Sequence, residues 1–119
     1  MLLNLIVPRI NDHMTEAIVE AVYAEEGEAL AIGAKLFDIT VDLSAAAPHD
    51  CPPISHYRLV LRERAWLRRI DARRREVCPL GAPLALFSTL PDEPVDQPPA
   101  RRPRMTVAMI MHQHAWSQA

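Results

Sequence analysis

The sequence predicts an all-β protein, and three observations support this prediction. Short apolar segments rich in β-branched and aromatic residues are separated by turn residues. Two glycines, Gly27 and Gly33, stand where a β-chain needs a positive φ or a close backbone approach. The third observation is an internal repeat, in which residues 16–39 align with residues 64–87 without a gap.

The repeat relates positions that are 48 residues apart and predicts two similar halves. Two halves are too few for a solenoid, so we expect a single core made from two interlocked half-sheets. Alanine matches carry little weight, because alanine is common in this chain. The evidence for the repeat therefore comes mainly from one identical glutamate, one identical glycine and one identical leucine. These pairs are Glu28 with Glu76, Gly33 with Gly81, and Leu36 with Leu84.

Six segments are expected to form strands by composition and alternation. The spacing in 14–24 also fits a helix, but β-branched and aromatic residues there favour a strand. The hairpin tip is expected at residues 42–44, and the three prolines within 45–55 predict a loop. The expected strands are residues 3–7, 17–23, 36–41, 57–61, 66–70 and 84–89.

The composition changes after the last expected strand. Residues 1–90 are expected to form the folded domain. Residues 91–104 contain five prolines between charged residues, which is typical of an extended, polyproline-type linker. Residues 105–119 are largely apolar, and such a segment would be a liability if it were fully exposed. We therefore expect it to dock on its own domain, on a second copy or on a protein partner.

The expected docking residues are Met105, Val107, Met109, Met111 and Trp116. The first four alternate along the chain, as one face of a strand does. Methionine side chains adapt to irregular surfaces. Addition of this strand to the edge of a sheet is the expected mode of docking.

Bulk composition excludes several classes of function. The net charge of −2 gives no general attraction to nucleic acid, and aromatic residues make up only 5%, too few for base-stacking platforms. The arginines of the second half then indicate a solvated or protein-binding face. No apolar run approaches the roughly 20 residues that span a bilayer. The two cysteines, Cys51 and Cys78, are expected to be reduced thiols in a cytoplasmic protein.

Several positions in the first half resemble the lipoyl domain of dihydrolipoyl acyltransferases, whose fold the biotinyl carrier domains share. The resemblance covers roughly residues 3–90. It implies a flattened barrel, or barrel-sandwich hybrid, of two four-stranded sheets related by a pseudo-twofold axis. A Pro-rich linker followed by a docking segment is also similar to those acyltransferases. The matching positions are Pro8, Met14-Thr15-Glu16, Ile18-Val19, Glu26-Gly27-Glu28, Gly33, Leu36, Ile39 and Asp42.

One departure from the family bears directly on function. In the family, a lysine follows the aspartate at the hairpin tip and carries lipoate or biotin through an amide bond. Here Leu43 follows Asp42, and leucine has no amine. Lys35 is the only lysine in the chain, and the resemblance places it in the body of the domain. We therefore expect no cofactor and no bound metal. The expected function is that of a non-catalytic structural or scaffolding subunit of a multi-component assembly, with a homo-oligomer as one form of that assembly.

Two other functions remain open at this point. The chain could be a lipoyl- or biotin-type carrier that is modified at Lys35. It could also be a small metal- or ligand-binding regulator, because His49, Asp50, Cys51 and His56 lie close together, and His112 and His114 could chelate a metal from one strand. The spacing of the first set matches no common zinc site, and the second set also fits two polar residues that end an apolar tail. The sequence contains no Gly-rich phosphate loop and no nucleophile-and-base signature, so we expect no enzymatic activity.

Overall fold

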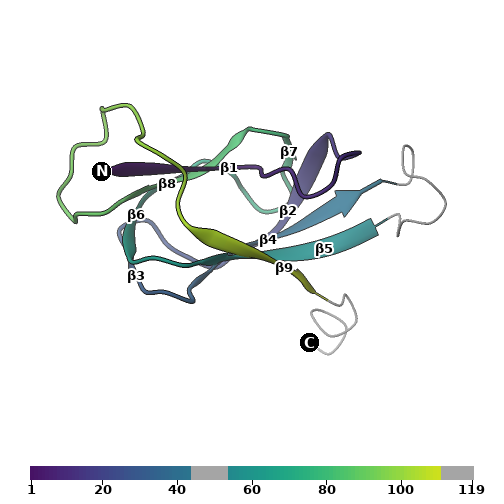
Figure 1. The fold of residues 1–119 in the computed structure, drawn as a ribbon, viewed down its shortest axis with the longest axis horizontal. Helices are drawn as coiled ribbons and strands as arrows, with labels where there is room; N and C mark the ends of the chain where they lie inside the picture. Colours follow the sequence, from purple (N-terminus) through teal and green to yellow (C-terminus); the bar gives the residue numbers. More distant parts are fainter. Residues whose placement is uncertain (44–53, 111–119) are drawn as a thin grey trace.

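The computed structural model describes residues 1–43 and 54–110 of the 119 residues. In these ranges the protein contains strands and no helix, so the all-β prediction is confirmed (Figure 1). The strands are β1 (Leu2–Ile6), β2 (Glu16–Val22), β3 (Ala29–Leu30), β4 (Lys35–Asp42), β5 (Ile54–Leu61), β6 (Ala65–Ile70), β7 (Val77–Pro79), β8 (Pro83–Ser88) and β9 (Met105–Ile110).

The strands form two antiparallel sheets. One sheet has the order β1-β8-β6-β3, and the other has the order β7-β2-β4-β5-β9. All six strands expected within residues 1–90 are present, with ends shifted by a few residues. Two further strands, β3 and β7, have only two and three residues, which is too short for a recognisable alternation.

The core lies between the two sheets and is built from matching rows of side chains. In the four-stranded sheet, Leu3, Phe87 and Leu67 lie opposite one another on β1, β8 and β6, and each is at most 2% exposed. Opposing residues in a ladder point to the same face, so this row forms a continuous apolar surface. In the other sheet, Ile39 on β4 lies opposite Val19, and both are fully buried.

The internal repeat is present in the backbone hydrogen bonds. In the first half, Glu28 N donates to Glu25 O at 3.1 Å, and Glu25 N donates to the Glu28 carboxylate at 3.0 Å. The second half repeats both bonds with Glu76 and Arg73, at 3.0 and 2.9 Å. These positions are 48 residues apart. The two glutamates therefore align because each closes the same turn through its own side chain.

The central residue of this turn has a positive φ in both halves. Gly27 has a φ of 89°, as the sequence predicts, and its counterpart Arg75 has a φ of 73°. Each donates its backbone N–H across to a strand, Gly27 to Leu67 O at 2.7 Å and Arg75 to Val19 O at 2.6 Å. The second half therefore holds an arginine where the backbone favours glycine.

Arg75→Gly is expected to stabilise the protein by about 0.5–1 kcal/mol, because glycine adopts this backbone conformation without strain. The matched variant Gly27→Ala, at the equivalent turn, should destabilise it by a similar amount. Urea unfolding of both variants measures the two effects. A loss of stability in Arg75→Gly would show that the Arg75 side chain contributes more than its backbone strain costs.

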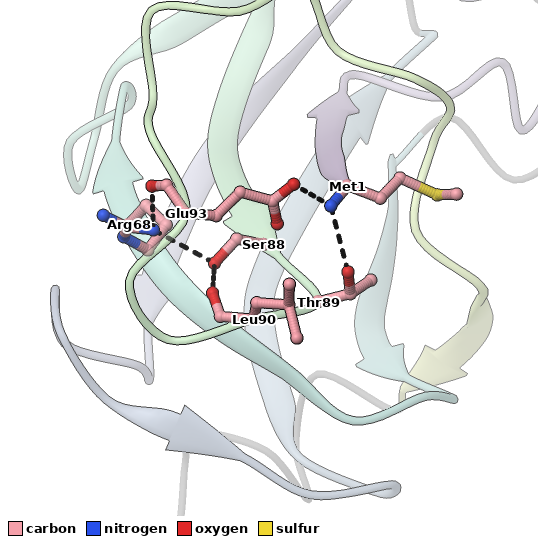
Figure 2. A network of polar contacts seen from close by, with 6 residues as sticks. All are labelled: Met1, Arg68, Ser88, Thr89, Leu90 and Glu93. Atoms are coloured by element: carbon pink, nitrogen blue, oxygen red, sulfur yellow. Dashed lines mark hydrogen bonds and ion pairs between the residues drawn. The ribbon is translucent and has the colours of Figure 1, made fainter.

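A network of polar contacts binds the residues that follow β8 to the body of the protein (Figure 2). Arg68 on β6 donates to the backbone oxygen of Glu93 at 2.6 Å and to Ser88 Oγ at 3.2 Å. The Ser88 side chain is fully buried and donates to Leu90 O at 2.6 Å. The amino group of Met1 donates to the Glu93 carboxylate. The start of the C-terminal segment is therefore fixed against β1, β6 and β8.

The C-terminal segment then passes from one sheet to the other. Residue Arg101 forms a parallel bridge with Leu3 and accepts a hydrogen bond from Asn4 N at 3.0 Å, at the outer side of β1. Strand β9 follows and pairs antiparallel with β5, at the edge of the five-stranded sheet (Figure 1). Residues 105–110 thus dock on their own chain, and residues 91–104, predicted as a linker, run along the surface of the body.

Candidate functional site

Strand β9 contains three of the five residues predicted to dock. Met105, Val107 and Met109 lie opposite Leu61, Leu59 and Tyr57 of β5. Met111 and Trp116 lie outside the described residues. Their role in docking stays a prediction.

The apolar side chains of β9 are only partly covered. Val107 faces the same side of the sheet as Leu59, because cross-strand partners share a face. Leu59 is fully buried, whereas Val107 is 39% exposed and Met109 is 65% exposed. On this face, exposure increases from Met105 to Met109, since Met105 is only partly exposed and packs against the core. The far half of β9 therefore presents apolar side chains to solvent.

The backbone of β9 is also open on one side. Arg62 N donates to Arg104 O at 2.8 Å, just before the strand begins. In an antiparallel ladder without register shifts, backbone groups alternate between the neighbouring strand and the opposite side. Thr106, Ala108 and Ile110 therefore face β5, and the N–H and C=O groups of Met105, Val107 and Met109 point away from it. Within the described ranges, no strand pairs with this outer edge.

Glu63, which lies between β5 and β6, binds the residues that precede β9. Both carboxylate oxygens accept hydrogen bonds from the Arg101 guanidinium at 2.8 Å, and one also accepts from Arg104 N at 2.6 Å. The hydrogen bonds from Arg101 lower the pKa of Glu63 to about 2, with a further contribution from the Arg104 backbone. This carboxylate therefore ties the C-terminal segment to the body.

This ion pair predicts a loss of stability in acid. The folded-state pKa of Glu63, about 2, lies below its ordinary value of 4.5, so its contribution is complete above the ordinary value and is lost between 4.5 and 2. Glu63→Gln is expected to destabilise the protein by about 2 kcal/mol at pH 7 and by much less near pH 2. Urea unfolding at several pH values measures this difference. A difference that does not change with pH would contradict the assignment.

Leu43 lies directly after β4, at the position where the resemblance expects an attachment lysine. Its side chain is 5% exposed and belongs to the hydrophobic core. The prediction that residues 42–44 form the hairpin tip is therefore wrong for this residue. Asp42 pairs with Ile54, so the connection between β4 and β5 comprises residues 43–53, of which 44–53 lie outside the described ranges.

Lys35 stands at the other end of β4 from Leu43. Its amine lies 5.7 Å from the centre of the Tyr23 ring, a distance typical of a cation–π contact. The residue is exposed and is the first residue of β4, directly after the turn in which the resemblance places it. This contact does not test whether a prosthetic group is attached at Lys35. The alternative of a carrier modified at Lys35 stays a prediction.

The five-stranded sheet carries a polar cluster that sequence reasoning missed. Asp38 on β4 is fully buried and lies opposite Arg58 of β5. The Arg58 guanidinium donates to both carboxylate oxygens of Asp38, at 2.8 and 3.1 Å. The Tyr23 hydroxyl donates to the same carboxylate at 2.5 Å. Burial, followed by the hydrogen bond to Asp38, raises the pKa of Tyr23. The hydrogen bond to Asp38 also raises the pKa of Arg58.

The only sequence signal for this cluster is an aspartate between the apolar residues Phe37 and Ile39 of β4. The three residues come from β4, β5 and the end of β2, and each donor is directed at the same carboxylate. Because both oxygens of Asp38 are already bonded, the cluster serves to join three strands.

A second polar row lies beside it, at Thr40 on β4. The Thr40 hydroxyl donates to the Glu20 carboxylate at 2.9 Å and lies 2.9 Å from His56 Nδ1. Since the hydroxyl hydrogen points to Glu20, the hydroxyl oxygen accepts from Nδ1–H of His56.

The two metal-site alternatives fall largely outside the described ranges. His56 belongs to β5, whereas His49, Asp50 and Cys51 lie in 44–53, and His112 and His114 lie in 111–119. Among residues 1–43 and 54–110, no three histidine, cysteine or carboxylate side chains are grouped so that they could hold a metal ion. The alternative of a metal-binding regulator stays a prediction.

Comparison with known proteins gives no family for this chain, because no family model, no curated protein and no solved structure matches it. The described residues also contain no helix of the length and apolar character that would cross a bilayer. The class of protein defined so far is an all-β domain of two antiparallel sheets, with a C-terminal strand added at one edge.

Proposed function

We propose that the chain is a non-catalytic, lipoyl-like structural or scaffolding subunit that docks in a multi-component cytoplasmic assembly through residues 105–119. The observation that carries the proposal is the burial of Leu43 directly after β4. A leucine offers no amine for an amide bond, and a buried side chain at this position cannot swing between active sites. Loss of the attachment point leaves the body and its open strand as the remaining functional parts.

The order of the strands supports the lipoyl-like part of this proposal. Under the repeat, β8, β6 and β3 correspond to β4, β2 and β7, and β1 corresponds to β5 by its place in the sheet. The order β1-β8-β6-β3 then matches the order β5-β4-β2-β7. Two four-stranded sheets with equivalent orders are expected for a flattened barrel with a pseudo-twofold axis. Strand β9 is an addition to that pattern.

The open edge of β9 supports the docking part. Exposed strands with unpaired backbone groups accept a further strand, and backbone hydrogen bonds then give affinity while side chains give specificity. The exposed apolar side chains of Val107 and Met109 lie along this edge.

Removal of residues 111–119 combined with Met109→Lys is expected to release the protein from its assembly. The measurement is the apparent size of the tagged protein in an extract of its native source, compared with the full-length chain. Ile32→Lys is a suitable control, because Ile32 is 61% exposed and lies in the turn after β3. An unchanged association in the altered protein would overturn the docking role.

The mass of the intact protein from its native source tests the non-carrier role. We expect the mass of the unmodified polypeptide, with no lipoyl or biotinyl addition. A covalently attached lipoyl or biotinyl group, for example at Lys35, would overturn the proposal and support a carrier domain instead.

A further inference from the structure

Strand β9 has a property that narrows the choice of partner: it carries no charged side chain from Met105 to Ile110. Natural edge strands commonly contain a charge, a proline or a bulge that prevents pairing with another chain. The strand β9 has none of these, and its pairing with β5 is regular along all six residues. An unprotected edge in an added strand is therefore a surface suited to strand pairing.

We propose that the occupant of this edge is a second copy of the chain, with the two β9 strands paired antiparallel about a twofold axis at Val107. This inference rests on the proposed docking role of residues 105–119. The two five-stranded sheets then join into one continuous sheet across the axis.

The direction of the backbone groups fits this register. With Val107 opposite Val107 of the second copy, Met105 lies opposite Met109, and Met109 lies opposite Met105. These are the three residues whose N–H and C=O groups point away from β5. Each such pair exchanges two hydrogen bonds, so the register satisfies every outward group of the strand. An axis at Met105 would place Pro103 opposite Val107, and proline has no N–H to donate.

The side chains fit the same register. The exposed apolar side chains of Val107 and Met109 lie on one face of the sheet, where Val107 meets Val107 and Met109 meets Met105 of the second copy. On the other face, Thr106 lies opposite Ala108, so two small residues meet. Charged residues directly opposite like charges destabilise a sheet, and no such pair arises within the six residues. A twofold contact of this kind closes on itself and ends at a dimer.

The oligomeric state of the purified full-length chain tests the proposal. Sedimentation velocity across a range of concentrations is expected to show a monomer–dimer equilibrium. Val107→Lys places two ammonium groups at the axis and should raise the dimer Kd by at least about tenfold. Ile32→Lys adds the same charge at an exposed position away from β9 and should leave the Kd unchanged. A protein that stays monomeric at every concentration would overturn the proposal. This holds also if residues 111–119 of the same chain cover the edge.

A cross-linking experiment tests the register directly. Hydrogen-bonded residues in an antiparallel pair have Cα atoms about 5.5 Å apart, within the range that a disulfide spans. Val107→Cys in a Cys51→Ser background is therefore expected to form a cross-linked dimer under mild oxidation. Thr106→Cys in the same background is the control, because residue 106 does not face its own counterpart. Equal cross-linking of both variants would overturn the register at Val107.

The two levels of the proposal separate experimentally. If Val107→Lys releases the protein from a larger assembly but the purified chain never dimerises, the partner is another protein, and the docking function stands without the dimer. If the purified chain dimerises as expected but the assembly tolerates both truncation and Val107→Lys, the dimer stands and the scaffolding function fails. Circular dichroism of Val107→Lys establishes that each comparison is made with folded protein.

Discussion

Asp38→Ala is expected to lower the free energy of unfolding by about 3 kcal/mol, one of the largest single effects in the described part of the chain. The substitution removes a fully buried carboxylate and leaves the Arg58 guanidinium and the Tyr23 hydroxyl without their shared acceptor. Breaking one side of a buried ion pair is costly because the remaining charge is left desolvated. Arg58 is 24% exposed, so water recovers part of this cost. Urea unfolding measures the change.

Three further variants separate the ion pair from general effects of substitution. Tyr23→Phe removes one hydrogen bond and should cost about 1 kcal/mol. The double variant Asp38→Ala with Arg58→Met should recover part of the loss, because no unpaired charge remains. Asp12→Ala, at an exposed carboxylate, should have little effect. If Asp38→Ala were no more harmful than Asp12→Ala, the cluster would contribute nothing to stability.

Leu43→Lys is expected to destabilise the protein by about 3 kcal/mol, because an ammonium group replaces a core side chain that is only 5% exposed. Leu43→Met conserves volume and polarity and should cost less than about 1.5 kcal/mol. Leu43→Lys also introduces a lysine at the position where the lipoyl and biotinyl carrier domains have one. We expect it to remain unmodified when incubated with a lipoate–protein ligase, lipoate and ATP, since the position lies in the core.

Intact mass and urea unfolding of Leu43→Lys give the two readouts together. Efficient lipoylation with unchanged stability would mean that residue 43 behaves as an exposed tip. Under the proposed function, the absence of an attachment point would then depend on residue 43 alone. Destabilisation without modification would mean that two features prevent attachment at this position, the burial of residue 43 in the core and the lack of an amine.

Local chemistry explains which strands the sequence could predict. Segments such as 36–41 and 84–89 combine strand-forming residues with turn residues on either side, so their conformation follows from their own composition. The short strands β3 and β7 are defined by their partner strands, since Ala29 pairs with Trp66 of β6 and Cys78 pairs with Ala17 of β2. A pairing of two or three residues leaves no periodic pattern in the sequence.

The polar cluster could not be predicted because its members are distant along the chain. Tyr23 and Asp38 are separated by 15 residues, and Asp38 and Arg58 by 20. Their meeting depends on the register of β4 against β5 and on the shift between β2 and β4 near Val19. A sequence pattern predicts that strands exist, but registers arise from cross-strand packing over the whole sheet.

The sequence by itself determined the all-β class, the internal repeat that aligns Glu28 with Glu76, and the absence of an amine in the side chain after Asp42. These properties depend on residue type and on neighbours close in the chain. Only the tertiary structure decided that residues 105–110 add to β5 of their own chain, that Leu43 is buried, and that Asp38 joins three strands. Each of these depends on which distant segments lie side by side, and local conformational preference does not encode that choice.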